Sequence, residues 1–169
     1  MDQNGKWLLC RLGNVWYGLD LSLVQEIVYN PALTSLPALG RSVAGIMDWM
    51  GRQITVVDIA VAGREGRPAP DIAQGQMPVV VLKAGLAPAD LSAPVHINGA
   101  GSATAKAGGD ALIGLLVDEV GEIISRQAGD KIEIDAVLAV TLKSVNQAFE
   151  YNDEIIFTLN CQELYRAIA

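Results

Sequence analysis

Four carboxylates stand near the ends of apolar segments, where a catalytic acid and a base could face each other. They are Asp48, Asp58, Asp118 and Glu119. Paired carboxylates can perform general acid–base chemistry when their surroundings move their pKa values apart. No second type of titrating residue and no metal-binding pattern accompanies them in the sequence. We therefore expect these side chains to accept hydrogen bonds from backbone N–H groups at turns, or to form a solvated rim.

The remaining reactive side chains are isolated from one another. His96 is the only histidine, and it lies in a segment rich in Ala, Gly, Ser and Pro with no Cys or His neighbour. It is expected to be a solvated surface residue. Cys10 and Cys161 each lie inside an apolar run, and their separation does not fit metal ligands. The sequence therefore predicts two buried, reduced thiols.

Sequence motifs of common enzymes are absent from the chain. It contains no H-E-x-x-H, C-x-x-C or G-x-S-x-G pattern. The glycine-rich stretch GAGSATAKAGG lacks the G-K-[ST] ending of a phosphate-binding loop. We expect no enzymatic activity, no cofactor and no bound metal.

Composition excludes several further classes. The chain has 169 residues, of which 51% are hydrophobic and 18% charged, so it has ample material for a core. Its net charge of −7 and the absence of a basic cluster argue against binding nucleic acid or an anionic membrane surface. The sequence has neither a signal peptide nor a run of about 20 apolar residues. A soluble, cytoplasmic protein without membrane insertion is predicted.

The elements that would position these residues are mainly short strands. Residues 6–21 are typical of a hairpin turning at Gly13-Asn14, and residues 142–160 of a second hairpin with Asn152-Asp153 at its tip. Apolar runs predict further strands over residues 52–61 and 77–85, and a strand pair over 111–125.

Other segments are expected to be less regular. Residues 38–50 suggest a short helix or an irregular turn that ends at Gly51, and 126–135 an irregular connection. Residues 86–110 suggest a long, dispensable surface loop. Residues 161–169 predict a short C-terminal helix capped by Asn160.

Two windows of the chain are similar to each other. YGLDLSLVQEIV (residues 17–28) aligns with IGLLVDEVGEII (113–124), so that Gly18 matches Gly114 and Glu26 matches Glu122. Each window follows an apolar strand. The pattern predicts a duplication that gives two small β-barrels with a shared apolar seam. Chance similarity between two β-rich windows is the alternative interpretation.

Taken in order, these motifs resemble the CheW-like domain family, which contains the chemotaxis coupling protein CheW and the last domain of the histidine kinase CheA. The resemblance rests on YGLDLSLVQEIV, the proline-bearing TSLP, VAGIMDWMGRQITVVDI and ALIGLLVDEVGEII. It implies a mostly β fold of two SH3-like five-stranded β-barrels that share a hydrophobic core, with short helices. It also implies a single domain over 1–169, with intertwined subdomains at about 15–80 and 81–160 and terminal segments crossing between them.

The resemblance further implies a non-catalytic scaffold and adaptor of chemotaxis signal transduction. Its partners would be CheA and the cytoplasmic tip of a methyl-accepting chemoreceptor. Val24 and Glu26 match family positions implicated in partner contact, and Gly45, Asp48, Met50 and Gly51 fall at the positions of the family's turn pattern. We predict a partner-binding surface at these residues, which Arg52, Val120 and Ile123 would extend.

One residue of this surface departs from the family pattern. Met50 stands where the family has an arginine, and Asp48 replaces the usual Asn. Because Arg52 lies two residues further on, an extended strand would project it to the side of residue 50, where it could supply the missing charge. Two other functions remain open: a divergent module for a different receptor or kinase pathway, and a β-barrel sensor that binds a small ligand.

Overall fold

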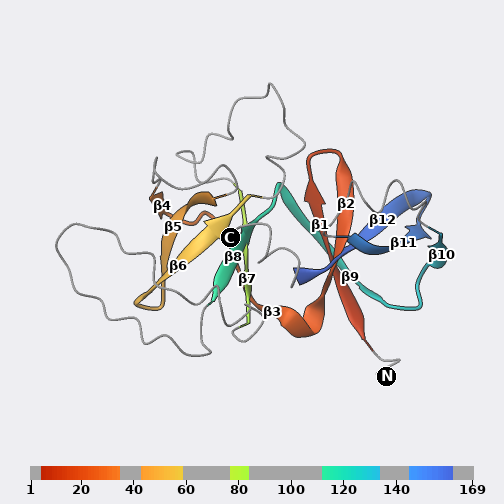
Figure 1. Cartoon of the computed structure of the whole chain (residues 1–169), viewed down its shortest axis with the longest axis horizontal. Helices are drawn as coiled ribbons and strands as arrows, with labels where there is room; N and C mark the ends of the chain where they lie inside the picture. Colours follow the sequence, from red (N-terminus) through yellow and green to blue (C-terminus); the bar gives the residue numbers. More distant parts are fainter. Residues whose placement is uncertain (1–4, 35–42, 59–76, 84–111, 134–144, 162–169) are drawn as a thin grey trace.

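The chain folds into two six-stranded β-sheets, which we describe from a computed structural model. The structure describes residues 5–34, 43–58, 77–83, 112–133 and 145–161 (Figure 1). These residues contain one short 3-10 helix, η1 (Leu21–Leu23), and no helix of seven or more residues. The prediction of a mostly β fold is confirmed, although each sheet has six strands and not five.

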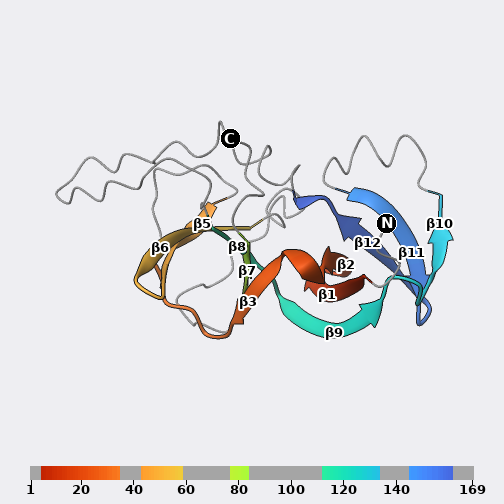
Figure 2. The same cartoon turned by 90° about the horizontal axis from the view of Figure 1, so that it is seen from below.

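Sheet A has the strand order β10-β11-β12-β2-β1-β9, and sheet B the order β3-β7-β8-β6-β5-β4. Sheet A curls into a half-barrel, so that β10 returns toward the end of β9 (Figure 2). The strands are β1 (Lys6–Leu12), β2 (Val15–Asp20), β3 (Val24–Val28), β4 (Leu33–Thr34), β5 (Val43–Trp49), β6 (Arg52–Val57), β7 (Val79–Leu82), β8 (Ile113–Leu116), β9 (Glu119–Ser125), β10 (Asp130–Ile132), β11 (Val145–Tyr151) and β12 (Glu154–Leu159).

The two sheets repeat one pattern of pairing. Gly18 on β2 lies opposite Leu9 in an antiparallel pair and opposite Thr158 in a parallel pair. Gly114 on β8 has the same two kinds of neighbour, Val81 and Val56. The β5–β6 and β11–β12 hairpins both have an irregularity after their first residue pair, and β6 and β12 share one burial pattern.

This register agrees with the duplication suggested by the sequence. Residues 6–57 form one unit and 79–159 the other. The units exchange hairpins: β1–β2 completes the sheet made by β9 to β12, and β7–β8 completes the sheet made by β3 to β6. Neither window of the repeat is α-helical.

Buried side chains form three clusters. One contains residues of both sheets, among them Leu8, Leu19, Val57 and Leu115, and is therefore the shared core. A second lies within sheet B around Met47 and Ile54, and a third within sheet A around Phe149 and Ile156. The alternation of inward and outward side chains along each strand explains why one strand serves two clusters.

Two expectations about local structure were wrong. Residues 43–49 form strand β5 where a short helix or an irregular turn was expected, because Gly45 and Met47 are buried and the strand pairs with β6. Residues 130–132, expected within an irregular connection, form β10 against β11. The 86–110 segment with His96 and, beyond Cys161, the predicted C-terminal helix lie outside the described residues.

Candidate functional site

The hairpin turn between β5 and β6 presents the most distinctive surface feature. Trp49 and Arg52 form its last residue pair, so Met50 and Gly51 make a two-residue turn. Their φ angles are +52° and +76°. Gly51 donates its N–H to Asp48 Oδ1 at 3.1 Å. The Met50 side chain is 81% exposed, more than any other large hydrophobic residue in the described part of the chain.

The turn is tied to strand β3 by a side-chain hydrogen bond. The indole Nε1 of Trp49 donates to Oε2 of Glu26 at 2.6 Å. Glu26 lies on β3, which is an edge strand of sheet B and pairs only with β7. Glu26 and the turn therefore form one continuous surface. Sequence reasoning missed Trp49, because no local signal in the sequence indicates that its indole reaches Glu26 on another strand.

The structure corrects the argument about Arg52. Projection of Arg52 to the side of residue 50 required an extended backbone, whereas Met50 and Gly51 occupy the left-handed region. Arg52 instead lies directly opposite Trp49 in the hairpin, and opposite residues of an antiparallel pair share a sheet face. Arg52 is thus on the face that Trp49 uses to reach Glu26.

The nine predicted contact residues are divided between the two sheets. Glu26, Asp48, Met50, Gly51 and Arg52 are exposed around one turn, whereas Gly45 is buried and Val24 packs half-buried against the shared core. Val120 and Ile123 lie on β9 in the other sheet, at the positions that Val24 and Ile27 hold in the first. Val120 also packs against the shared core, and Ile123 is 52% exposed.

The four carboxylates considered for acid–base chemistry all interact with neighbouring groups. Asp48 accepts from Gly51, Asp118 Oδ2 accepts from the N–H of Gly13, and Glu119 pairs with Arg11 at 2.9 Å. The fourth, Asp58, is buried at 3% exposure. Among the described residues, no group of three His, Cys, Asp or Glu side chains could hold a metal ion.

The thiols are buried as expected, because Cys10 is 0% and Cys161 3% exposed. Burial, together with the proximity of Cys161, raises the pKa of Cys10 to about 12. Burial, together with the charge of Asp20, raises the pKa of Cys161 to about 11. Neither group is a nucleophile at neutral pH, since the thiolate is the reactive form.

The exchanged hairpins and the shared core define the class as a duplicated, mostly β domain. The chain belongs to the CheW-like domain family, whose model matches residues 6–169. This family consists of non-catalytic scaffolds of chemotaxis signalling.

A solved structure supports the fold. The scaffolding protein TtCheW from Thermoanaerobacter tengcongensis superposes with a TM-score of 0.61 at 20% sequence identity, covering 93% of this chain and 84% of that one. No curated protein matches the chain. In the part of the chain that the structure describes, no helix is long and apolar enough to cross a membrane.

Proposed function

We propose that the protein is a cytoplasmic adaptor that couples the tip of a methyl-accepting chemoreceptor to the histidine kinase CheA. Membership of the CheW-like family supports this function. The proposal includes the finer architecture of two SH3-like barrels, with subdomains near 15–80 and 81–160. The repeated strand order of sheets A and B supports two such halves, whereas β2 in sheet A and β8 in sheet B fall on the other side of these bounds and fit segments that cross between the halves.

The partner surface that we propose consists of two parts. Glu26, Asp48, Gly51 and Arg52 form a polar rim around Met50. Val24 and Gly45 lie on β3 and β5 of the same sheet, whereas Val120 and Ile123 lie on β9 of the other sheet. A receptor tip is helical, and helices dock in grooves through a few apolar anchors. The exposure of Met50 is the observation that carries this assignment.

The Trp49–Glu26 bond favours a second candidate, a divergent module for another receptor or kinase. The Glu26 carboxylate, which an arginine at residue 50 could have bound, already accepts the indole N–H. A partner that met an arginine in typical family members would meet an apolar thioether here. Among the described residues, nothing at the seam between the sheets specifically favours the small-ligand sensor.

Calorimetric titration with the CheA regulatory domain and with a receptor-tip hairpin tests both candidates. If the partners are the ordinary ones, Met50→Arg binds as well as the wild type or better. If they have diverged, Met50→Arg weakens binding by about 1–3 kcal/mol, because the added charge is desolvated on an apolar partner. Asn152→Arg is the matched control, since residue 152 holds the equivalent place in the β11–β12 turn.

Arg52→Ala separates the charged rim from the apolar anchor. It is expected to weaken binding and to reduce its salt dependence. Neither partner binding the wild-type protein would contradict the adaptor proposal itself. Unchanged affinity in all three variants, with wild-type binding intact, would place the contact surface elsewhere on the domain.

A further inference from the structure

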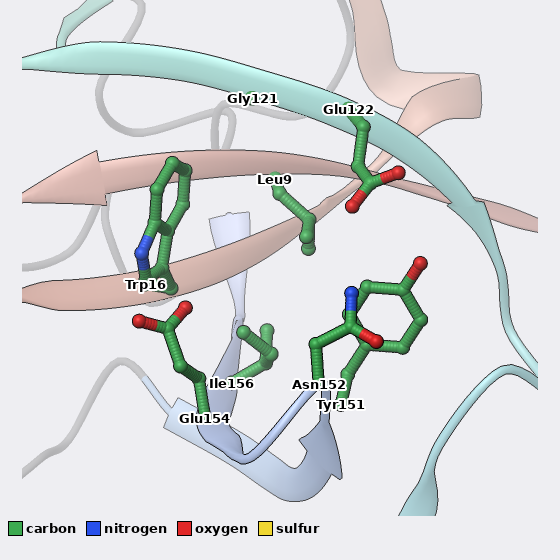
Figure 3. Close-up of a pocket in the computed structure, with 8 residues that line it drawn as sticks. All are labelled: Leu9, Trp16, Gly121, Glu122, Tyr151, Asn152, Glu154 and Ile156. Atoms are coloured by element: carbon green, nitrogen blue, oxygen red, sulfur yellow. The ribbon is translucent and has the colours of Figure 1, made fainter.

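A small depression opens at the end of sheet A that carries the β11–β12 turn. Its volume is about 210 Å³. Leu9 and Ile156 form its apolar floor, and Figure 3 shows two opposed walls above it. Trp16 and Glu154 form one wall, and Tyr151 and Glu122 form the other. The two carboxylates and the two aromatic rings therefore face a common space.

The side chains that line the depression attract a cation, and none of them is itself cationic. Its described lining contains two glutamates and no Lys, Arg or His. Among the described residues, the side chains of Glu122 and Glu154 form no hydrogen bond or ion pair. A cation can gain from the carboxylates and from the faces of Trp and Tyr at once.

The duplication shows what the equivalent place contains in sheet B. Tyr151 pairs with Glu154 at the end of the β11–β12 hairpin, and Trp49 pairs with Arg52 at the end of the β5–β6 hairpin. Tyr151 is therefore equivalent to Trp49, and Glu154 to Arg52. The register also equates Glu122 with Glu26, two residues after Val120 and Val24 respectively. The sheet B place thus has an aromatic residue, a glutamate and its own arginine. In sheet A that arginine is replaced by a second glutamate.

Elsewhere the chain holds an arginine side chain between an aromatic ring and a carboxylate. The guanidinium carbon of Arg126 lies 4.6 Å from the centroid of the Trp7 ring. Arg126 also forms an ion pair with Asp20. An arginine is thus held between an indole face and a carboxylate on the same sheet. The planar guanidinium suits this arrangement better than an ammonium group, because it can stack and form two hydrogen bonds.

Room for the ring is provided by Gly121. A Cβ at this position would lie 2.8 Å from Cζ3 of Trp16. The equivalent residue in sheet B is Gln25. Glycine therefore lets the indole lie against β9 and form one side of the depression.

We propose that this depression binds the side chain of an arginine from a protein partner. The guanidinium would stack on Trp16 and pair with Glu122 and Glu154, with its aliphatic stem over Leu9 and Ile156. The net charge of −7 also favours a basic partner segment. The site is separate from the β5–β6 turn that carries Met50, although Glu122 directly precedes Ile123 on β9. The inference does not depend on the identity of the kinase or receptor.

The test uses the full chain labelled with ¹⁵N and the probe Nα-acetyl-arginine amide. The readout is the indole N–H signal of Trp16, assigned by its loss in Trp16→Phe. We expect a saturable shift with a Kd on the order of millimolar, as befits a fragment of a larger ligand. Nα-acetyl-citrulline amide, which has nearly the same shape without the charge, should produce no saturable shift.

Variants locate the binding. Glu122→Gln and Glu154→Gln should each raise the Kd by roughly 5- to 10-fold, because each removes one charge-assisted contact. Glu150→Gln is the matched control, since Glu150 is an exposed glutamate of β11 outside the depression, and its Kd should not change.

Four results would overturn the proposal. The first three are no saturable shift with the arginine probe, equal binding of the citrulline probe, and an unchanged Kd in both glutamine variants. The fourth is equal affinity for tetramethylammonium, because the site would then recognise any organic cation. The readout involves this chain alone, so failure to bind a kinase or receptor would leave the result unaffected.

Discussion

Trp49 and Glu26 connect a hairpin turn to the edge of a sheet through a single 2.6 Å hydrogen bond. Their counterparts in the other half, Tyr151 and Glu122, line an open depression instead. The two halves therefore have the same backbone arrangement at this place but different side-chain chemistry. The difference in stability between the two places can be measured by making the same kind of substitution at equivalent residues, such as Trp49 and Tyr151.

Loss of the hydrogen-bonding group should lower the free energy of unfolding at Trp49 but not at the equivalent residue, Tyr151. Trp49→Phe keeps an aromatic ring but loses the bond to Glu26, so we expect the free energy of unfolding to fall by about 0.5–1 kcal/mol. Tyr151→Phe is the control, because its hydroxyl forms no hydrogen bond among the described residues, and it should change stability little. Urea denaturation measures both. An equal loss in the two variants would show that the bond contributes nothing specific.

Gly18 and Gly114 are equivalent in register but differ in the space around them. A Cβ at Gly114 would lie 2.7 Å from Cγ1 of Val79, a fully buried side chain. At Gly18 the nearest atom, in the Trp7 ring, is 3.5 Å away, which is ordinary contact. Gly114→Ala should therefore destabilise the protein by about 1–3 kcal/mol. Gly18→Ala should stay within about 1 kcal/mol of the wild type, and thermal unfolding that ranked them in reverse would contradict this packing.

Acid should weaken the contact between Arg126 and Asp20. Burial tends to raise the pKa of Asp20, but hydrogen bonds from Ser22 and the Arg126 guanidinium outweigh burial and lower it. A carboxyl whose folded-state pKa is lowered stabilises the fold above its unfolded pKa of about 3.9, and this contribution is lost as the pH falls through the folded value.

The Arg126→Met variant isolates this contribution. It should be less stable than the wild type by about 1 kcal/mol near neutral pH, through loss of the ion pair and the contact with Trp7. The difference should shrink at pH values below about 4, as Asp20 protonates in the wild type. Lys6→Met, which changes an exposed basic residue of β1, is the control. A difference that grew in acid would contradict the assignment.

Cys10 and Cys161 should react only when the chain unfolds. Their pKa values of about 12 and 11 leave almost no thiolate at neutral pH, and both side chains are buried. Iodoacetamide labelling followed by mass spectrometry should therefore proceed at the rate of unfolding and accelerate in urea. Rapid stoichiometric labelling of the folded protein would contradict the burial of either thiol.

Strands with strong local signals could be predicted from the sequence. Apolar runs on both sides of Gly13-Asn14 and Asn152-Asp153 fixed two hairpins, since turn chemistry and alternation agree there. Strand β5 could not be found in this way, because Gly45 and Asp48 interrupt its pattern and its stability comes from pairing with β6. The three-residue β10 similarly depends on β11.

The sequence could be used to predict which residues lie near the β5–β6 turn, but not the side-chain contacts among them. The sequence-based prediction included Glu26, Met50 and Arg52, and the structure places all three beside the β5–β6 turn. The prediction could not identify Trp49 as the donor to Glu26, because that contact joins strands far apart in the chain. Exchange of hairpins between the halves also determines which residues line the sheet A depression. Trp16 and Tyr151 meet there although most of the sequence separates them.

Met50 occupies a backbone conformation that does not suit it. With φ at +52° it costs about 1–2 kcal/mol relative to a residue that tolerates the left-handed region. Asn152 has the same φ at the equivalent place, and asparagine is a preferred residue of such turns. Because Met50 is 81% exposed, its replacement removes little packing. Met50→Asn should therefore raise the free energy of unfolding by about 0.5–1 kcal/mol, and Asn152→Met should lower it by a similar amount.

The same substitution should act in the opposite direction on partner binding. A residue that is unfavourable for folding and exposed to solvent is expected to be retained for function. Met50→Asn should thus stabilise the domain yet weaken binding of its kinase or receptor partner, because it removes the apolar anchor. Paired urea denaturation and calorimetry on one preparation measure both effects. A variant that gained stability with no loss of affinity would show that Met50 is not part of the partner surface, whichever partner the protein serves.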